Sequence, residues 1–195
     1  MTQSTDKTRI KQHAERSVPE EAASILAQGL VAHVAFSLEG RPYVIPFSYH
    51  YDPAVPDRLY LHGSLDSRAL LHLASGAPVC VEVCLLDGLV YSRTALYHSM
   101  NYRSAICFGR SRAVEDETVK REILREMIAR YFEGRAEGRD YEAPSPAHLD
   151  TTALLELFIE EWSAKARSGE PKGPRDADPE APGTAGVQPP RRSSK

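Results

Sequence analysis

Runs of β-branched and aromatic residues, separated by turn-forming residues, are the feature that most constrains the fold of this chain. Two dipeptides, Glu39-Gly40 and Asp87-Gly88, stand between neighbouring runs and favour tight hairpin turns. This spacing is typical of an antiparallel barrel or sandwich and not of a doubly wound parallel sheet. The expected strands cover residues 31–38, 43–51, 58–62, 79–86, 89–94 and 104–114.

Helices are expected to flank these strands. Ser17-Val18-Pro19-Glu20 has the composition of a capping box that opens a helix, and Gly29 offers its end. Residues 65–74 and 116–132 repeat apolar side chains at helical spacing, so both predict amphipathic helices. Residues 152–162 suit either a buried strand or a helix by composition, and we predict a strand.

Length and composition favour one domain between two polar ends. The chain has 195 residues, of which 42% are hydrophobic, enough for an ordinary core. We expect a flexible N-terminus at residues 1–14, a folded domain at 15–169 and a disordered Gly-, Pro- and Ser-rich tail at 170–195. The sequence shows neither a secretory signal nor an apolar run of membrane length, which predicts a cytoplasmic protein without membrane contact.

Charge and cysteine content argue against several functions. The 24 Lys and Arg residues are scattered among 27 Asp and Glu, which gives little attraction for nucleic acid. Cys80, Cys84 and Cys107 lie inside apolar runs without Cys-x-x-Cys spacing, so we interpret them as reduced packing residues. The histidines share no metal-ligand spacing, and we therefore expect no metal site.

Two polar blocks match the chemistry of phosphate binding. The first, with Ser64, Ser67 and Arg68, follows a strand-like run, and the second covers residues 100–104. Hydroxyl, backbone N–H and guanidinium groups bind phosphate by directed hydrogen bonds and charge. A simpler alternative for the first block is that Ser64 or Asp66 caps the next helix while Arg68 is solvated. The second block has no capping role at a strand entrance, so the two together favour a phosphorylated ligand.

Several segments, taken in order, resemble the pyridoxamine 5'-phosphate oxidase-like flavin-binding split-barrel superfamily. The resemblance covers about residues 30–169. Within the superfamily, the chain most resembles the flavin-nucleotide-binding branch that includes nitroimidazole-resistance proteins. The matching segments are Leu30-Val31-Ala32-His33-Val34, Pro42-Tyr43-Val44-Ile45-Pro46-Phe47-Ser48-Tyr49, Leu59-Tyr60-Leu61-His62-Gly63-Ser64 with Ser67-Arg68, and Met100-Asn101-Tyr102-Arg103-Ser104 with Gly109-Arg110.

This resemblance implies a mainly β fold with flanking helices, namely a six-stranded antiparallel split β-barrel. It also implies a homodimer that binds FMN at the subunit interface and acts on a small-molecule substrate. The implied cofactor-binding residues are Val44, Ile45 and Pro46 along the flavin ring, His62, Ser64, Ser67 and Arg68 at the phosphate, Tyr102, Arg103 and Ser104 at a second flavin contact, and Lys165 and Arg167 near the end of the domain. Solvated charge is an equal alternative for Lys165 and Arg167.

The leading functional hypothesis is an FMN-dependent oxidoreductase that moves hydride or electrons from a reduced donor to a small acceptor, such as a nitro compound. The alternative from a different class is a module that stores or senses flavin without turnover. A third hypothesis is haem binding, for which His62 or His98 is the candidate iron ligand. The chain lacks the Arg-Leu-x-Pro-like ending of true pyridoxamine phosphate oxidases, which argues against vitamin B6 oxidation. The sequence assigns no catalytic side chain.

Overall fold

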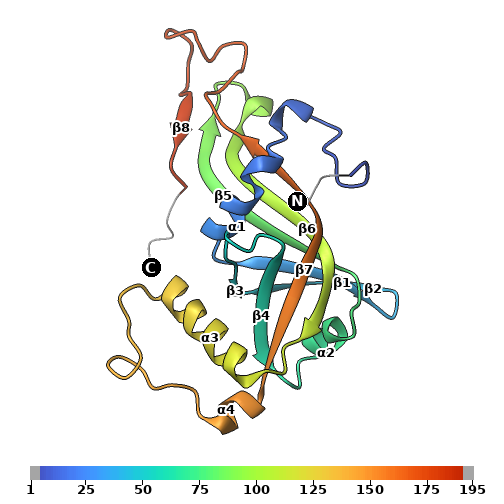
Figure 1. Ribbon diagram of the computed structural model, residues 1–195. Helices are drawn as coiled ribbons and strands as arrows, with labels where there is room; N and C mark the ends of the chain where they lie inside the picture. The colour runs from blue at the N-terminus through green and yellow to red at the C-terminus, as the bar shows by residue number, and fades with distance from the viewer. Residues whose placement is uncertain (1–4, 191–195) are drawn as a thin grey trace.

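The computed structural model describes residues 5–190 and builds them around one antiparallel sheet (Figure 1). The strand order is β2-β1-β5-β6-β7-β4-β3, and β8 pairs with β5 beside this path. The strands are β1 (Ala32–Leu38), β2 (Arg41–Phe47), β3 (Tyr49–His50), β4 (Arg58–Ser64), β5 (Val79–Tyr91), β6 (Ser99–Ala113), β7 (Thr152–Arg167) and β8 (Gly186–Gln188). The helices are α1 (Ala22–Gln28), α2 (Arg68–Ala74), α3 (Glu117–Tyr131) and α4 (Pro146–Asp150), with 3-10 turns at Ala14–Arg16, Pro19–Glu21 and Ala95–Tyr97.

The mainly β, antiparallel fold with flanking helices confirms the predicted fold class, with eight strands among the described residues instead of six. Alternation along the strands separates a buried face from an outward face. On the buried face Val34 pairs with Val81 and Val81 with Cys107, and all three are 0% exposed. Helix α1 packs against β5 and β6, and the buried Tyr49 hydroxyl donates to the Leu26 carbonyl at 2.6 Å. Burial raises the pKa of the Cys107 thiol to about 12, as expected for an unreactive packing residue.

The two predicted hairpin turns have different outcomes. Glu39-Gly40 joins β1 to β2 with φ angles of 52° and 76°, the left-handed conformation that a tight hairpin turn requires. The prediction for Asp87-Gly88 is wrong, because β5 continues through both residues with a register shift between Leu86 and Gly88. A bulge of this kind bends a strand without ending it. The two short strands expected here are therefore one long strand.

Strands β6 and β7 are also longer than the sequence suggests. β6 begins at Ser99, so the block at 100–104 lies inside the strand and not at its entrance. β7 confirms the strand predicted at 152–162 and extends it to Arg167. Its neighbouring residues Leu154 and Leu155 are each 1% exposed, which shows that β7 is covered on both faces. Such coverage explains a continuous apolar run in place of alternation.

Both chain ends have more structure than expected. Residues 170–190 were expected to be part of a disordered tail, but they include β8, which pairs with Leu89–Tyr91 of β5. Asp176 fixes this segment by accepting hydrogen bonds from Ser92 Oγ and the Arg93 and Gly173 amides. Within the expected flexible N-terminus, Thr5 Oγ1 donates to Glu161 of β7. Residues 1–4 and 191–195 lie outside the described residues.

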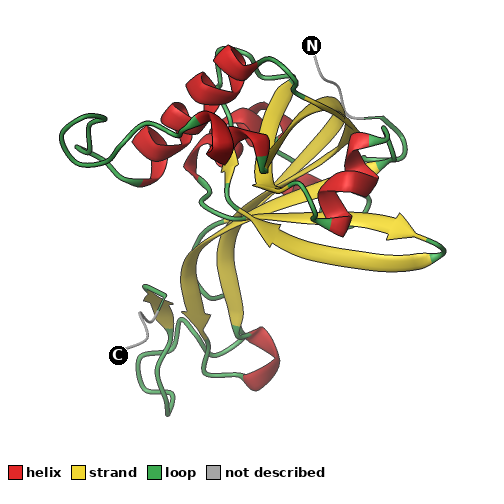
Figure 2. Cartoon of the chain, turned by 90° about the horizontal axis from the view of Figure 1, so that it is seen from below, coloured by secondary structure: helices red, strands yellow, loops and turns green. Residues whose placement is uncertain are grey.

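The elements are distributed unevenly about the sheet. Helices α3 and α4 lie at one end, and the distal part of the β5–β6 hairpin extends away at the other with β8 beside it (Figures 1 and 2). None of the helices in residues 5–190 has the length and apolar character needed to cross a membrane. The distal part of the β5–β6 hairpin, with β8 beside it, therefore forms an arm that protrudes from the barrel-like body (Figure 2).

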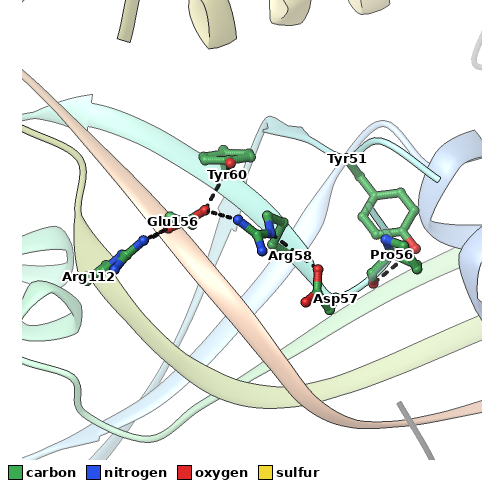
Figure 3. A network of polar contacts seen from close by, with 7 residues as sticks. All are labelled: Tyr51, Pro56, Asp57, Arg58, Tyr60, Arg112 and Glu156. Atoms are coloured by element: carbon green, nitrogen blue, oxygen red, sulfur yellow. Dashed lines mark hydrogen bonds and ion pairs between the residues drawn. The ribbon is translucent and has the colours of Figure 1, made fainter. Parts of the chain in front are cut away.

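A buried carboxylate joins three strands on the outward face (Figure 3). Glu156 of β7 is 5% exposed and accepts hydrogen bonds from Arg58 at 2.9 Å, Tyr60 at 3.0 Å and Arg112 at 2.7 Å. Burial alone would raise the pKa of Glu156, but the hydrogen bonds from Arg112 and Tyr60 and the charges of both arginines hold it below its ordinary value of 4.5. This network links β4, β7 and β6.

Replacing Glu156 by Gln should lower the free energy of unfolding by about 2 kcal/mol near neutral pH, because two guanidinium groups lose their shared anion. The lowered pKa means that the carboxylate stabilises the native state fully above pH 4.5 and loses this effect as the pH falls through its native pKa. Urea unfolding of both proteins at neutral and at strongly acidic pH checks this expectation. A difference that grows on acidification would contradict it.

Candidate functional site

The residues predicted to lie along a flavin ring are on the free edge of the sheet. Among the described residues, β2 pairs with β1 and with no other strand, so its second edge keeps unpaired backbone groups. Val44 is 65% exposed and shares the outward face with Pro46, whereas Ile45 packs against the core. The edge predicted from the proline-flanked sequence is thus present, with Val44 and Pro46 on the surface.

The first polar block lies where β4 leads into α2. Ser67 is the N-cap of α2 and accepts from the Leu70 amide at 3.4 Å, while Ser64 Oγ accepts from the Asp66 amide at 3.2 Å. The simpler alternative expects the cap at Ser64 or Asp66, whereas the cap is Ser67 and Ser64 makes a turn contact. Arg68 is exposed, and its guanidinium lies 4.9 Å from the centre of the Tyr43 ring of β2. The cation is thereby held close to the free edge of β2.

The second block splits across the two faces of β6. Tyr102 and Ser104 point outward, and Arg103 points to the opposite side, because successive residues of a strand alternate. The Arg103 guanidinium donates to both carboxylate oxygens of Asp87 at 2.9 Å and to Gln28 of α1 at 3.0 Å. The hydrogen bond to Asp87 raises the pKa of Arg103. Arg103 is thus already paired with a carboxylate inside its own chain.

The two candidate cations near the end of β7 lie beside the second block. Register pairing sets Lys165 opposite Ser104 and Arg167 opposite Tyr102, so the structure brings these four residues together. The Arg167 guanidinium donates to the Asn101 side chain, and Lys165 Nζ lies 3.5 Å from the Gln12 carbonyl. The second block and the closing segment therefore form one polar region.

The first and second blocks do not meet within one chain. Val44, Ala35, Cys80 and Phe108 are paired across neighbouring strands and form one row of the sheet. Tyr43 lies one residue to one side of this row. Ser104 lies four residues from Phe108 in the other direction along β6. With about 3.3 Å per residue and about 4.8 Å per strand, the path along the sheet from Tyr43 to Ser104 is about 20 Å. The two blocks are therefore not neighbours on the sheet of one chain.

The same row forms an exposed apolar strip across four strands. Val44 is 65% exposed and Phe108 is 38% exposed, and Ala35 and Cys80 lie between them on the same face. Leu86, further along β5, is 44% exposed. A strip of this kind on the outward face of a sheet is typical of a surface that another molecule covers.

His62 lies away from the first block, in a cavity of about 570 Å³. Alternation along β4 directs Leu61 into the core and His62 to the opposite side, where α3 runs. His62 Nδ1 is buried and has no hydrogen-bond partner. Burial lowers the pKa of His62, so its imidazole is neutral near neutral pH. The cavity is lined by Ser48, His62, Arg121, Leu124, Arg125, Met127, Ile128, Tyr131, Phe132, Glu137, Tyr141, Glu142, Pro144 and His148.

The cavity lies between α3, β4 and the segment that follows α3. The apolar side chains Leu124, Met127 and Ile128 of α3 line the cavity, and Met127 is the only residue of α3 in the buried class. Arg121 fixes the far side by donating to the Pro144 carbonyl at 2.5 Å. Sequence periodicity predicts this helix and its apolar face correctly. It gives no sign that the face borders a cavity, because periodicity shows which residues are apolar and not what covers them.

The remaining histidines offer less for a ligand. His148 lines the cavity, but its Nδ1 accepts from the Ser145 amide in a capping box. His98, the other candidate iron ligand from the sequence, lies between the 3-10 turn Ala95–Tyr97 and β6, and its ring contacts that of Tyr91. Among the described residues, no group of three or more His, Cys, Asp or Glu side chains is placed to hold a metal ion.

Comparison with known proteins shows to which family this chain belongs. The sequence pattern of the pyridoxamine 5'-phosphate oxidase family matches residues 19–166. The chain belongs to this family. The match confirms the resemblance inferred from the ordered motifs. No curated protein matches the chain.

Solved structures within and around the family are similar over most of the chain. The flavocytochrome Anf3 from Azotobacter vinelandii has 32% identity and a TM-score of 0.82, covering 100% of this chain and 89% of its own. The FAD and haem binding protein from Mycobacterium smegmatis has 33% identity and a TM-score of 0.77. The match covers 89% of this chain and 83% of that protein's chain. A candidate 5-nitroimidazole antibiotic resistance protein from Bacteroides thetaiotaomicron has 25% identity and a TM-score of 0.63. The match covers 76% of this chain and 85% of that protein's chain.

The pairing of Arg103 with Asp87 gives a testable expectation about stability. Arg103→Ala and Asp87→Ala should each destabilise the protein, and the double variant should cost less than the sum, with a coupling of about 0.5–1 kcal/mol. Chemical unfolding of the four proteins measures this coupling. Strictly additive effects would show that the ion pair makes no net contribution.

Proposed function

We propose that this protein is a homodimeric, flavin-binding redox protein. Family membership supports this proposal, as do the names of the two structures above 30% identity, a flavocytochrome and an FAD and haem binding protein. The observation that carries it is the exposed Arg68 guanidinium, held over Tyr43 beside the free edge of β2. A guanidinium without an ion pair among the described residues, next to unpaired backbone groups, suits a flavin phosphate and ring.

The homodimer is inferred from the separation of the two polar blocks. Within one chain the path along the sheet between them is about 20 Å, but a second copy related by a two-fold axis can bring Ser104 and Lys165 of one protomer towards Arg68 of the other. The exposed strip from Val44 to Phe108 offers the apolar surface that such an interface would cover. Two equivalent flavin sites per dimer follow from the symmetry.

A bound flavin supplies hydride or electron transfer through its ring. In this proposal Arg68 holds the phosphate, the backbone at Val44 and Pro46 meets the ring edge, and the hydroxyls of Tyr102 and Ser104 contact the flavin from the partner protomer. Arg103 acts indirectly, because its guanidinium is bound to Asp87. The sequence predicts FMN, whereas the relative from M. smegmatis is named for FAD. The acceptor is a small molecule such as a nitro compound.

Haem is a second candidate group, favoured by the cavity beside His62. Haem iron needs one or two protein ligands, since the porphyrin occupies the other positions. His62 lines the largely apolar cavity of about 570 Å³ with a neutral imidazole, and its buried Nδ1 has no hydrogen-bond partner, which fits this need. Arg125, more than half exposed at the cavity, provides a cation for acidic substituents of the macrocycle. The relatives named as a flavocytochrome and as a haem binding protein agree with this fit.

Arg68→Ala should weaken flavin binding at least tenfold, or about 1.4 kcal/mol, because the phosphate loses its guanidinium. Fluorescence titration with FMN and with FAD measures the affinity and identifies the preferred nucleotide. Arg175→Ala, at an exposed position in the C-terminal segment, is the matched control. Equal flavin affinities of the two variants would show that Arg68 does not bind the flavin phosphate.

Mixed dimers test whether each site uses both chains. A dimer of one Arg68→Ala chain and one Tyr102→Ala chain retains one intact site if the two blocks come from different protomers. The same dimer has a defect in both sites if each chain forms its own site. Flavin binding should therefore return to about half of the wild-type capacity in the mixed dimer.

His62→Ala should lower haem affinity at least tenfold, whereas His98→Ala should leave it unchanged. Titration of the purified protein with ferric haem, followed by absorbance, measures both. Circular dichroism confirms that each variant is folded. Unchanged haem binding by the His62 variant would place any haem elsewhere.

A further inference from the structure

We propose that His33, oriented by Glu82, is the proton donor of the redox reaction and delivers a proton to the acceptor as a hydride reaches it. This role rests on the proposed flavin function and extends it, because the sequence assigns no side chain to proton transfer. The geometry of the pair, its surroundings and its place beside β2 all support the role.

His33 and Glu82 form a hydrogen-bonded pair on neighbouring strands. They are opposite each other in the register of β1 and β5, and His33 Nδ1 lies 3.0 Å from Glu82 Oε2. A carboxylate in this position fixes the orientation of the ring and favours a proton on Nδ1. It also attracts the positive charge that the ring carries once Nε2 takes up a second proton. Among the described residues Nε2 has no hydrogen-bond partner, so this nitrogen is free to exchange a proton with another molecule.

The pair stands in an uncharged part of the outward face. Its neighbours there are Ala35 on β1, Val44 and Pro46 on β2, Cys80 and Cys84 on β5 and Ile106 on β6. Burial raises the pKa of both thiols, which keeps them neutral. A partly exposed pair of this kind adds little to stability. An imidazole oriented by a carboxylate, with its other nitrogen free, is instead the arrangement used in acid–base chemistry.

The register of the sheet sets this imidazole beside the free edge of β2. His33 is directly opposite Pro46, whose backbone meets the flavin ring in the proposed function. Residues opposite each other on neighbouring antiparallel strands have Cβ atoms about 4.5–5.5 Å apart. His33 is also the one ionisable side chain that β1 and β2 carry on this face. It is therefore the group best placed to protonate a molecule bound against the ring.

The proposed reaction needs one proton besides the hydride. A bound flavin supplies the hydride, which carries two electrons and one proton and leaves the reduced acceptor short of a second proton. The His33 imidazolium provides it: the Nε2–H bond breaks, and a new bond to hydrogen forms on the acceptor. The ring becomes neutral and keeps its hydrogen bond to Glu82, and solvent returns a proton to Nε2.

Two electron acceptors separate proton transfer from electron transfer. Benzoquinone takes up protons when it is fully reduced, whereas ferricyanide takes up one electron and no proton. With reduced, flavin-loaded protein, His33→Gln and Glu82→Gln should each slow reoxidation by benzoquinone about tenfold or more and leave reoxidation by ferricyanide unchanged. The unchanged ferricyanide rate also shows that each variant is folded and loaded. His13→Gln is the matched control, because His13 makes a similar contact of 3.1 Å with Glu15 in the N-terminal segment.

A second measurement does not depend on turnover. Diethyl pyrocarbonate acylates neutral imidazole nitrogens, and mass spectrometry follows the modification of each histidine in the wild-type protein. Saturating FMN or FAD should slow the acylation of His33 about tenfold, because a bound ring covers Nε2, and should leave that of His13 unchanged.

The outcomes distinguish this role from the flavin function itself. Flavin binding that leaves His33 as reactive as before would overturn the role and leave the flavin function intact. Equal slowing with benzoquinone and ferricyanide would also overturn it, since the pair would then be structural. A wild-type protein that binds neither FMN nor FAD would overturn the flavin function and this role together.

Discussion

Pairing of β6 with β5 on one side and β7 on the other sets the position of the second polar block and of Lys165 and Arg167. β6 contributes 15 residues to this pairing, and its register decides which side chains face outward. At the register shift beside Phe108, a Cβ on Gly109 would lie 1.8 Å from the Phe158 carbonyl oxygen. Only glycine allows the two strands to approach so closely at this point. The bulge and the glycine together keep the outward apolar strip and the Glu156 network on one continuous face.

The sheet separates two chemical environments. The free edge of β2 and the polar residues of β6 and β7 form an open, hydrogen-bonding surface. The space between β4 and α3 is open to solvent on one side, and its lining is mostly apolar with a few charged side chains. A flavin and a haem need different surroundings, since the first needs phosphate contacts and the second needs burial and an axial donor. The residues proposed for the flavin and those proposed for the haem do not overlap.

The sequence was sufficient to predict the fold class, the Glu39-Gly40 turn, the strand at 152–162 and the family, because these depend on local composition and on the order of motifs. It failed at Asp87-Gly88, where pairing with the neighbouring strand holds the chain extended through a turn-like dipeptide. It could not show that Asp87 would pair with Arg103, since that contact depends on register. His62 was identified as a candidate, but the motif grouped it with the phosphate contacts and alternation directs it to the cavity.

The C-terminal strand has a consequence for how the molecule behaves in a crowded solution. β1 covers the edge of β5 only near Cys80–Glu82, so the distal half of β5 would expose a row of free amides and carbonyls. β8 occupies that edge at Leu89–Tyr91, and Asp176 holds the connecting segment in place. Free strand edges are templates for pairing with other chains. The segment that composition marks as a tail therefore leaves less of this edge free to pair with another chain.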